Sequence, residues 1–117
     1  FEVQAELYVL LRALGCLVRG EVKIPGGGER GARFDLVAYG HNRKAICIIE
    51  CKPNIPWKFR NSMYAVQERE HRLKQIERYR SFGIPVILCE GHQNIPKTIE
   101  RVTECVLAAA GERLQHS

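Results

Sequence analysis

Residues 45–52, with the sequence Ala-Ile-Cys-Ile-Ile-Glu-Cys-Lys, constrain the fold more than any other part of the chain. Such an apolar run is typical of a buried strand, yet it ends with Glu50 and Lys52. Side chains two residues apart on a strand point to the same face, so the acid and the base are expected side by side. Buried charges are costly unless they pair or hold a metal ion. The segment therefore predicts a central strand that ends in either a buried ion pair or a metal site.

A second acid, Asp35, lies in the preceding strand-like run, residues 32–39. If the two runs pair as a hairpin, Asp35 and Glu50 can approach each other across neighbouring strands. Two like charges at that distance repel unless a cation lies between them, and such oxygen-rich sites suit magnesium, with manganese able to substitute. The backbone carbonyl of Cys51 would add a further oxygen ligand. Lys52 would then orient or help deprotonate an attacking water.

The remaining elements follow from hydrophobic periodicity and from glycine and proline positions. Helices are predicted at residues 2–14, 63–82 and 95–110, and strands at 18–24, 32–39, 45–51 and 85–89. The glycine-rich residues 25–31 are predicted to form a hairpin loop and lack the Gly-Lys-Ser/Thr ending of a phosphate loop. The expected apolar stripes of the first two helices comprise Val3, Leu7, Leu10, Leu11 and Leu14, and Ala65, Val66, Leu73, Ile76 and Tyr79.

The element order α-β-β-β-α-β-α predicts a single domain, residues 1–117, of the α/β class. Its four-stranded sheet is expected to be mixed and covered by helices on both faces. The last strand follows a helix, so it is expected to lie parallel to the strand at 45–51.

Composition indicates a soluble, cytoplasmic protein with 45% hydrophobic and 26% charged residues and no segment long enough to span a bilayer. The net charge of +5 is compatible with an acidic polymer as partner. Five cysteines without a Cys-x-x-Cys motif predict reduced core thiols and argue against a zinc site. The chain begins at Phe1 and not at Met, which is compatible with a piece of a longer protein.

Two helices offer further candidates for the site. Glu6 lies about 40° from Leu10 on a helical wheel, so it borders the buried stripe and is a candidate third carboxylate. An acid near a helix start is also favoured by the helix dipole alone. Gln75 and Tyr79 share one face of the 63–82 helix, and Arg72 continues this edge toward the predicted cleft. They are candidates for substrate binding or ordinary residues at the edge of the core.

The segment 53–62 places Trp57 and Phe59 between the cations Lys58 and Arg60. Aromatic residues interleaved with cations suit stacking on bases and contact with phosphates. They also suit a loop whose aromatic side chains cover the core, and this is what we expect of Trp57. Lys58 and Arg60 are the candidates for phosphate contact.

Three motifs together resemble the PD-(D/E)xK nuclease superfamily. They are Arg33-Phe34-Asp35, then Ile49-Glu50-Cys51-Lys52, then Gln75 to Tyr79, which is similar to the Gln-x-x-x-Tyr element of its RecB-like branch. The segment Arg33-Phe-Asp-Leu-Val, followed by Ile-Ile-Glu-Cys-Lys at residues 48–52, also looks like the nuclease domain of type I restriction motor subunits. The resemblance covers nearly the whole chain and implies a restriction-endonuclease-like core. Phe34 stands where the family often has proline, which supplies no side-chain chemistry.

The resemblance implies that Asp35 and Glu50 bind Mg²⁺, that Lys52 serves catalysis, and that Glu6 matches the first-helix acid. Gln75 and Tyr79 would hold the substrate strand or Lys52. The expected function is a metal-dependent deoxyribonuclease, an endonuclease that acts on DNA, with a homodimer, a higher homo-oligomer or a larger nuclease complex as candidate assemblies. A non-catalytic nucleic-acid-binding module, a subunit of a restriction, repair or recombination complex, and an end-directed or structure-specific exonuclease remain alternatives.

Overall fold

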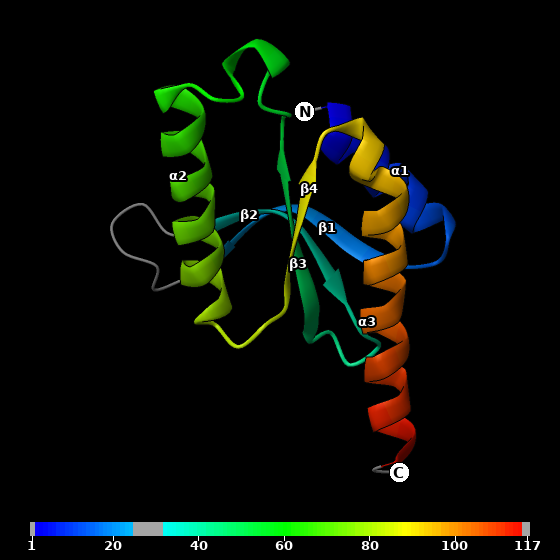
Figure 1. Cartoon of the computed structure of the whole chain (residues 1–117). Helices are drawn as coiled ribbons and strands as arrows, with labels where there is room; N and C mark the ends of the chain where they lie inside the picture. Colours follow the sequence, from blue (N-terminus) through cyan, green and yellow to red (C-terminus); the bar gives the residue numbers. More distant parts are fainter. Residues whose placement is uncertain (1, 25–31, 116–117) are drawn as a thin grey trace.

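A computed structural model describes residues 2–24 and 32–115, so the predicted glycine-rich loop lies outside the described residues. The helices and strands follow one another in the predicted order (Figure 1). The helices are α1 (Glu2–Ala13), α2 (Met63–Arg80) and α3 (Ile95–Gln115), and the strands are β1 (Leu17–Ile24), β2 (Ala32–Tyr39), β3 (Ala45–Lys52) and β4 (Val86–Glu90). Two short 3₁₀ helices, η1 (Trp57–Phe59) and η2 (His92–Asn94), follow β3 and β4.

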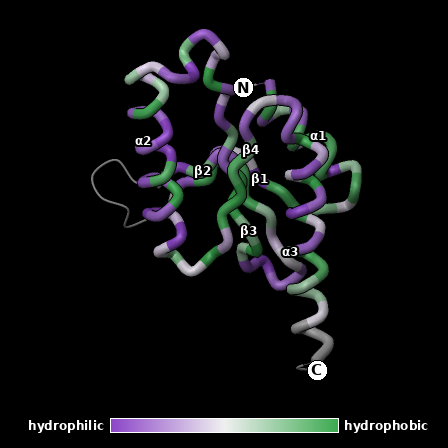
Figure 2. The backbone as a smooth tube through the Cα atoms, in the orientation of Figure 1, coloured by the Kyte–Doolittle hydropathy of each residue, from purple (hydrophilic) through white to green (hydrophobic). Residues whose placement is uncertain are grey.

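The four strands form one mixed sheet in the order β1-β2-β3-β4. β2 pairs in antiparallel orientation with both β1 and β3, whereas β4 pairs with β3 in parallel, which confirms the α/β class with a mixed sheet. Figure 1 shows α1 and α3 on one side of this sheet and α2 on the other. The apolar strands β3 and β4 run between the helices, as the colouring of Figure 2 shows.

The main core lies between the sheet and the helices α1 and α3. Leu7 and Leu11 of α1 and Val102 of α3 are fully buried there, and so is Ile49 of β3. Two other members of the expected α1 stripe are not buried in this core, because Leu10 is 37% and Leu14 62% exposed. The α1 stripe is therefore narrower than predicted.

The five cysteines are free thiols, and burial is the main cause that raises the pKa of Cys47 and Cys51 to about 12.

The second, smaller core lies under α2 and contains Phe34, Val37, Ile48 and Tyr79. The expected α2 stripe is partly wrong, since Val66 is 43% and Leu73 60% exposed. The buried residues of α2 recur every seven positions, at Ala65, Arg72 and Tyr79. A charged residue thus occupies the middle of the helix face that packs on the sheet.

Among the residues that the structure describes, no helix is long and apolar enough to cross a bilayer.

Candidate active site

The site begins where β2 and β3 separate. The last pair of their ladder on this side is Leu36 with Ile49, and Asp35 and Glu50 follow it. The backbone N–H of Asp35 donates to Glu50 Oε1 at 3.2 Å, and the backbone N–H of Cys51 donates to Asp35 Oδ2 at 2.8 Å. Each carboxylate thus accepts a backbone hydrogen bond from the other strand. The structure brings the two acids together, as the sequence predicts.

The environment of the Glu50 carboxyl group disfavours its ionised form. The residue is only 2% exposed. Burial, followed by the nearby charge of Asp35, raises the pKa of Glu50 to about 7, although the N–H of Asp35 and the charge of Lys52 act in the opposite direction. The ionised form of Glu50 is therefore destabilised, first by burial and then by the like charge of Asp35, and the surrounding groups only partly offset this. A bound cation would relieve this destabilisation.

Lys52 ends β3 on the same strand as Glu50. It is half-buried and stands in parallel register with Glu90 of β4. Its backbone carbonyl accepts a hydrogen bond of 2.9 Å from the N–H of Gly91, so the strand end is fixed to β4. In the described part of the chain no carboxylate forms a salt bridge with Lys52. Its ammonium group remains available to a ligand.

The Gln75–Tyr79 element of α2 is joined to the strand that carries Asp35. Gln75 Nε2 donates to Tyr79 Oη at 3.0 Å, and Tyr79 Oη donates to the carbonyl oxygen of Arg33 at 3.3 Å. The Tyr79 ring packs edge-on against Phe34, with ring centroids 4.6 Å apart. Burial raises the pKa of Tyr79; its bond with Gln75 opposes this, and the charges of Glu50 and Asp35 add to it. The phenol thus stays protonated and supports the β2 backbone beside the acids.

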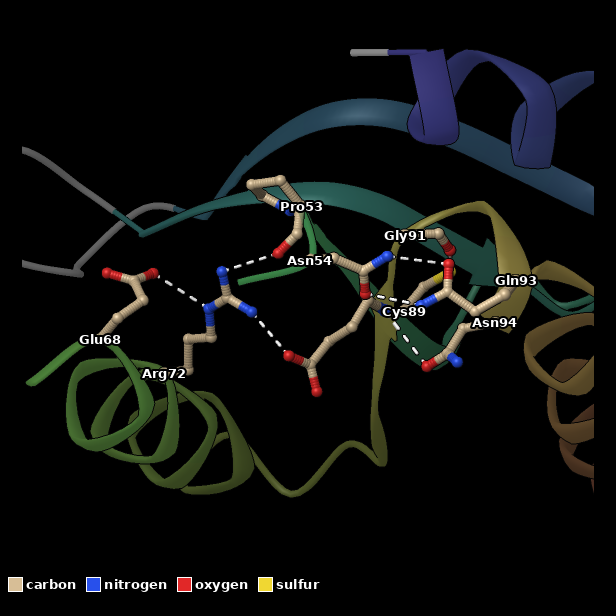
Figure 3. A network of polar contacts seen from close by, with 9 residues as sticks. Pro53, Asn54, Glu68, Arg72, Cys89, Gly91, Gln93 and Asn94 are labelled. Carbon is tan, nitrogen blue, oxygen red and sulfur yellow. Dashed lines mark hydrogen bonds and ion pairs between the residues drawn. The ribbon is translucent and has the colours of Figure 1, made fainter. Parts of the chain in front are cut away.

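Arg72 has a structural environment that its sequence position did not suggest. Its guanidinium donates from Nε to Glu68 at 3.0 Å, from Nη1 to Glu90 at 2.6 Å and from Nη2 to the carbonyl of Pro53 at 2.8 Å. Figure 3 shows this side chain reaching from α2 to β4 and to the segment after β3. Because all three nitrogens donate to protein oxygens, the placement does not support the predicted contact of Arg72 with a substrate.

Pro53, which accepts from Arg72, directly follows Lys52, so Arg72 ties the candidate catalytic lysine to α2 and β4. The neighbouring segment is tied as well. Asn54 and Gln93 exchange side-chain hydrogen bonds of 2.9 and 2.6 Å, also visible in Figure 3. The carboxyl ends of β3 and β4 are therefore held together by side chains as well as by their ladder.

Glu6 does not lie with the other two acids. Its carboxylate is half-exposed and lies 3.5 Å from Nε2 of His92. Within residues 2–24 and 32–115, no three His, Cys, Asp or Glu side chains gather in a group that could hold a metal ion. From the same helix, Gln4 Nε2 donates to the carbonyl of Asp35 at 3.1 Å. Sequence reasoning missed Gln4, although its position three residues before the buried Leu7 marks a polar group on the buried stripe.

The remaining candidates lie in the segment between β3 and α2. Lys58 and Arg60 are exposed, so both cations can reach a ligand. The expectation that Trp57 covers the core is wrong, because the residue is 84% exposed.

Comparison with known proteins assigns no family and no function to this chain. No protein-family model matches the chain, and no curated protein and no solved structure matches it significantly. The chemistry of the site must therefore be argued from its own residues.

Proposed function

We propose that this chain is a Mg²⁺-dependent deoxyribonuclease, an endonuclease that hydrolyses phosphodiester bonds in DNA. The proposal rests on one observation above all, the meeting of Asp35 and Glu50 where β2 and β3 part. Lys52 on the same strand adds a cation whose charge acts on Glu50. The order of helices and strands is compatible with the restriction-endonuclease-like core that the sequence motifs imply.

The residues fit a magnesium ion. Magnesium is usually held by one or two carboxylates, with waters and substrate phosphates as its other ligands. Asp35 and Glu50 supply the two carboxylates, and a cation would favour the ionised form of Glu50, whose pKa is raised by burial first and by the charge of Asp35 second. The carbonyl of Cys51 stays a predicted further ligand, and Mn²⁺ is expected to substitute for Mg²⁺. When bound, the ion would polarise the scissile phosphate and lower the pKa of a bound water.

The protein's own groups would perform the other tasks. Lys52 would position the attacking water and stabilise negative charge that builds up on the phosphate oxygens. Gln75 and Tyr79 would hold the backbone beside Asp35, since Tyr79 already bonds to the carbonyl of Arg33. Lys58 and Arg60 would hold the DNA backbone by phosphate contacts, which position a substrate without reading its sequence. Binding should therefore weaken as the salt concentration rises.

The experiment that tests the proposal is cleavage of supercoiled, linear, branched and single-stranded DNA, with Mg²⁺ and with a chelator. We expect cleavage that requires Mg²⁺. Glu50→Gln and Lys52→Ala should each lower the rate about 100-fold or more while the fold persists. Glu104→Gln and Lys44→Ala change exposed residues of the same types elsewhere in the chain and should leave the rate unchanged. Equal activity in all four variants would refute the assignment.

A non-catalytic nucleic-acid-binding module is the second candidate, since no third metal-holding side chain joins Asp35 and Glu50 among the described residues. A titration with Mn²⁺ separates the two functions. A folded chain that binds DNA but no divalent cation would favour the binding module.

A further inference from the structure

The segment between Lys52 and α2 is well anchored. The carbonyl of Pro53 is held by Arg72, and the carbonyl of Arg60 accepts a hydrogen bond of 3.3 Å from Arg69 Nη2. Ser62 caps α2, because its hydroxyl accepts the N–H of Ala65 at 3.3 Å. In Figure 1 the segment forms the arch that joins the end of β3 to the start of α2. Its side chains are therefore presented from a fixed backbone.

The anchored segment exposes an aromatic surface. Trp57 is 84% exposed, which is unusual for a side chain whose burial in a core or an interface is strongly favourable. Phe59 and Tyr64 form an edge-on pair with centroids 5.8 Å apart, and both are partly exposed. Lys58 Nζ lies 5.1 Å from the centre of the Phe59 ring. Most of the Trp57 side chain is therefore accessible to a ligand.

The same surface is positively charged. Lys58 and Arg60 are the charged residues that line it, and the sequence has no acid between Glu50 and Glu68. Trp57, Lys58 and Arg60 line an open concavity of about 390 Å³ together with Asn61 and Ser62. The concavity thus combines one flat aromatic face with two cations. This is the combination that binds the base and the phosphates of an unpaired strand.

We propose that this surface binds a single DNA strand, with an unpaired base stacked on Trp57 and its phosphates on Lys58 and Arg60. The inference rests on the proposed nuclease function in one respect, since it names unpaired or frayed DNA as the substrate of that site. In a duplex all base faces except those of the terminal pairs are covered by their neighbours, so an exposed indole finds far fewer faces to stack on than in a single strand. The segment starts directly after Lys52. A strand bound there would therefore be held next to the end of β3 that carries Glu50 and Lys52.

The test measures binding without cleavage, in a chelator. Trp57 is the only tryptophan of the chain, so its fluorescence reports on this surface alone. We expect quenching by a single-stranded oligothymidylate and much weaker quenching by a blunt duplex of the same length. In anisotropy measurements with a labelled single strand, Trp57→Ala should weaken binding about 5- to 150-fold, and Trp57→Phe should retain most of the affinity.

Tyr8→Ala is the matched control, because Tyr8 is also an exposed aromatic residue beside a cation, with Arg12 5.8 Å from its ring centre. It should leave the affinity unchanged. Equal quenching by duplex, equal loss in the Tyr8 variant, or a response to anionic phospholipid vesicles in place of DNA would each overturn the inference. Quenching by single strands in a chain that never cleaves DNA would support the inference while the nuclease proposal fails. Cleavage without any Trp57 response would do the reverse.

Discussion

The backbone N–H of Asp35 donates to Glu50 Oε1 across the point where β2 and β3 part, at 3.2 Å. The reciprocal bond, from the N–H of Cys51 to Asp35 Oδ2, is 2.8 Å long. These bonds fix the position of both carboxylates but neutralise neither charge. The protonation of Glu50 is therefore coupled to the stability of the fold and to any cation that binds there.

The raised pKa of Glu50 predicts how stability depends on pH. Its pKa is about 7 in the folded chain and 4.5 ordinarily, so the folded state binds more protons between these values. Stability from this group is therefore highest below pH 4.5 and falls as the pH rises toward 7. Glu50→Gln removes this loss. In urea unfolding without metal, the stability of the variant relative to the wild type should rise by about 3 kcal/mol from acid to alkaline pH. A constant difference across that range would contradict the assigned pKa.

Divalent cations should stabilise the wild-type chain through the same two acids. At a Mn²⁺ concentration 100 times its dissociation constant, one site adds about 2.7 kcal/mol to the free energy of unfolding. Thermal unfolding should therefore shift upward with Mn²⁺ in the wild type and in Glu104→Gln. The shift should vanish in Asp35→Asn and in Glu50→Gln. A shift that survives in both variants would place the cation elsewhere.

The strands and the sheet were predictable because their signals are local. The apolar segment at 45–52 and the glycine and proline residues around it define β3 and its neighbours within a residue or two. The meeting of Asp35 and Glu50 followed from pairing two adjacent strands. Side chains whose partners come from distant segments could not be placed in this way. Arg72 bonds to Glu90 and Pro53, which lie 18 and 19 residues away, so its burial has no local signal.

Exposure was the second property that the sequence predicted poorly. Hydrophobicity alone assigns Trp57, Leu73 and Leu14 to the core, yet all three are at least 60% exposed. A periodic pattern shows that a helix has an apolar face, but it does not show how wide the contact with the sheet is. For Glu6 and Gln4 the same pattern could not decide which polar residue at the stripe reaches Asp35.

Tyr79→Phe tests the support that α2 gives to β2. The substitution removes the hydroxyl that bonds to Gln75 and to the carbonyl of Arg33, but it keeps the ring against Phe34. We expect a loss of about 1 kcal/mol in the free energy of unfolding, measured in urea. Tyr64→Phe changes a 55% exposed tyrosine and should lose less than about 0.5 kcal/mol. If both variants unfold like the wild type, the Tyr79 hydroxyl has no structural role.

Arg72→Met tests the buried connection between α2, β4 and the strand end at Lys52. Methionine keeps much of the apolar volume, but Glu90 and the carbonyl of Pro53 lose their donor. Removing one partner of a buried charge pair is strongly destabilising, so we expect a loss of about 3 kcal/mol in urea unfolding. Arg101→Met, at an exposed position of α3, should cost less than about 0.5 kcal/mol. In the Glu90→Gln background the loss at Arg72 should be smaller by about 1 kcal/mol, because the two residues are coupled. Additive losses would mean that the hydrogen bond of 2.6 Å between them contributes nothing measurable to the fold.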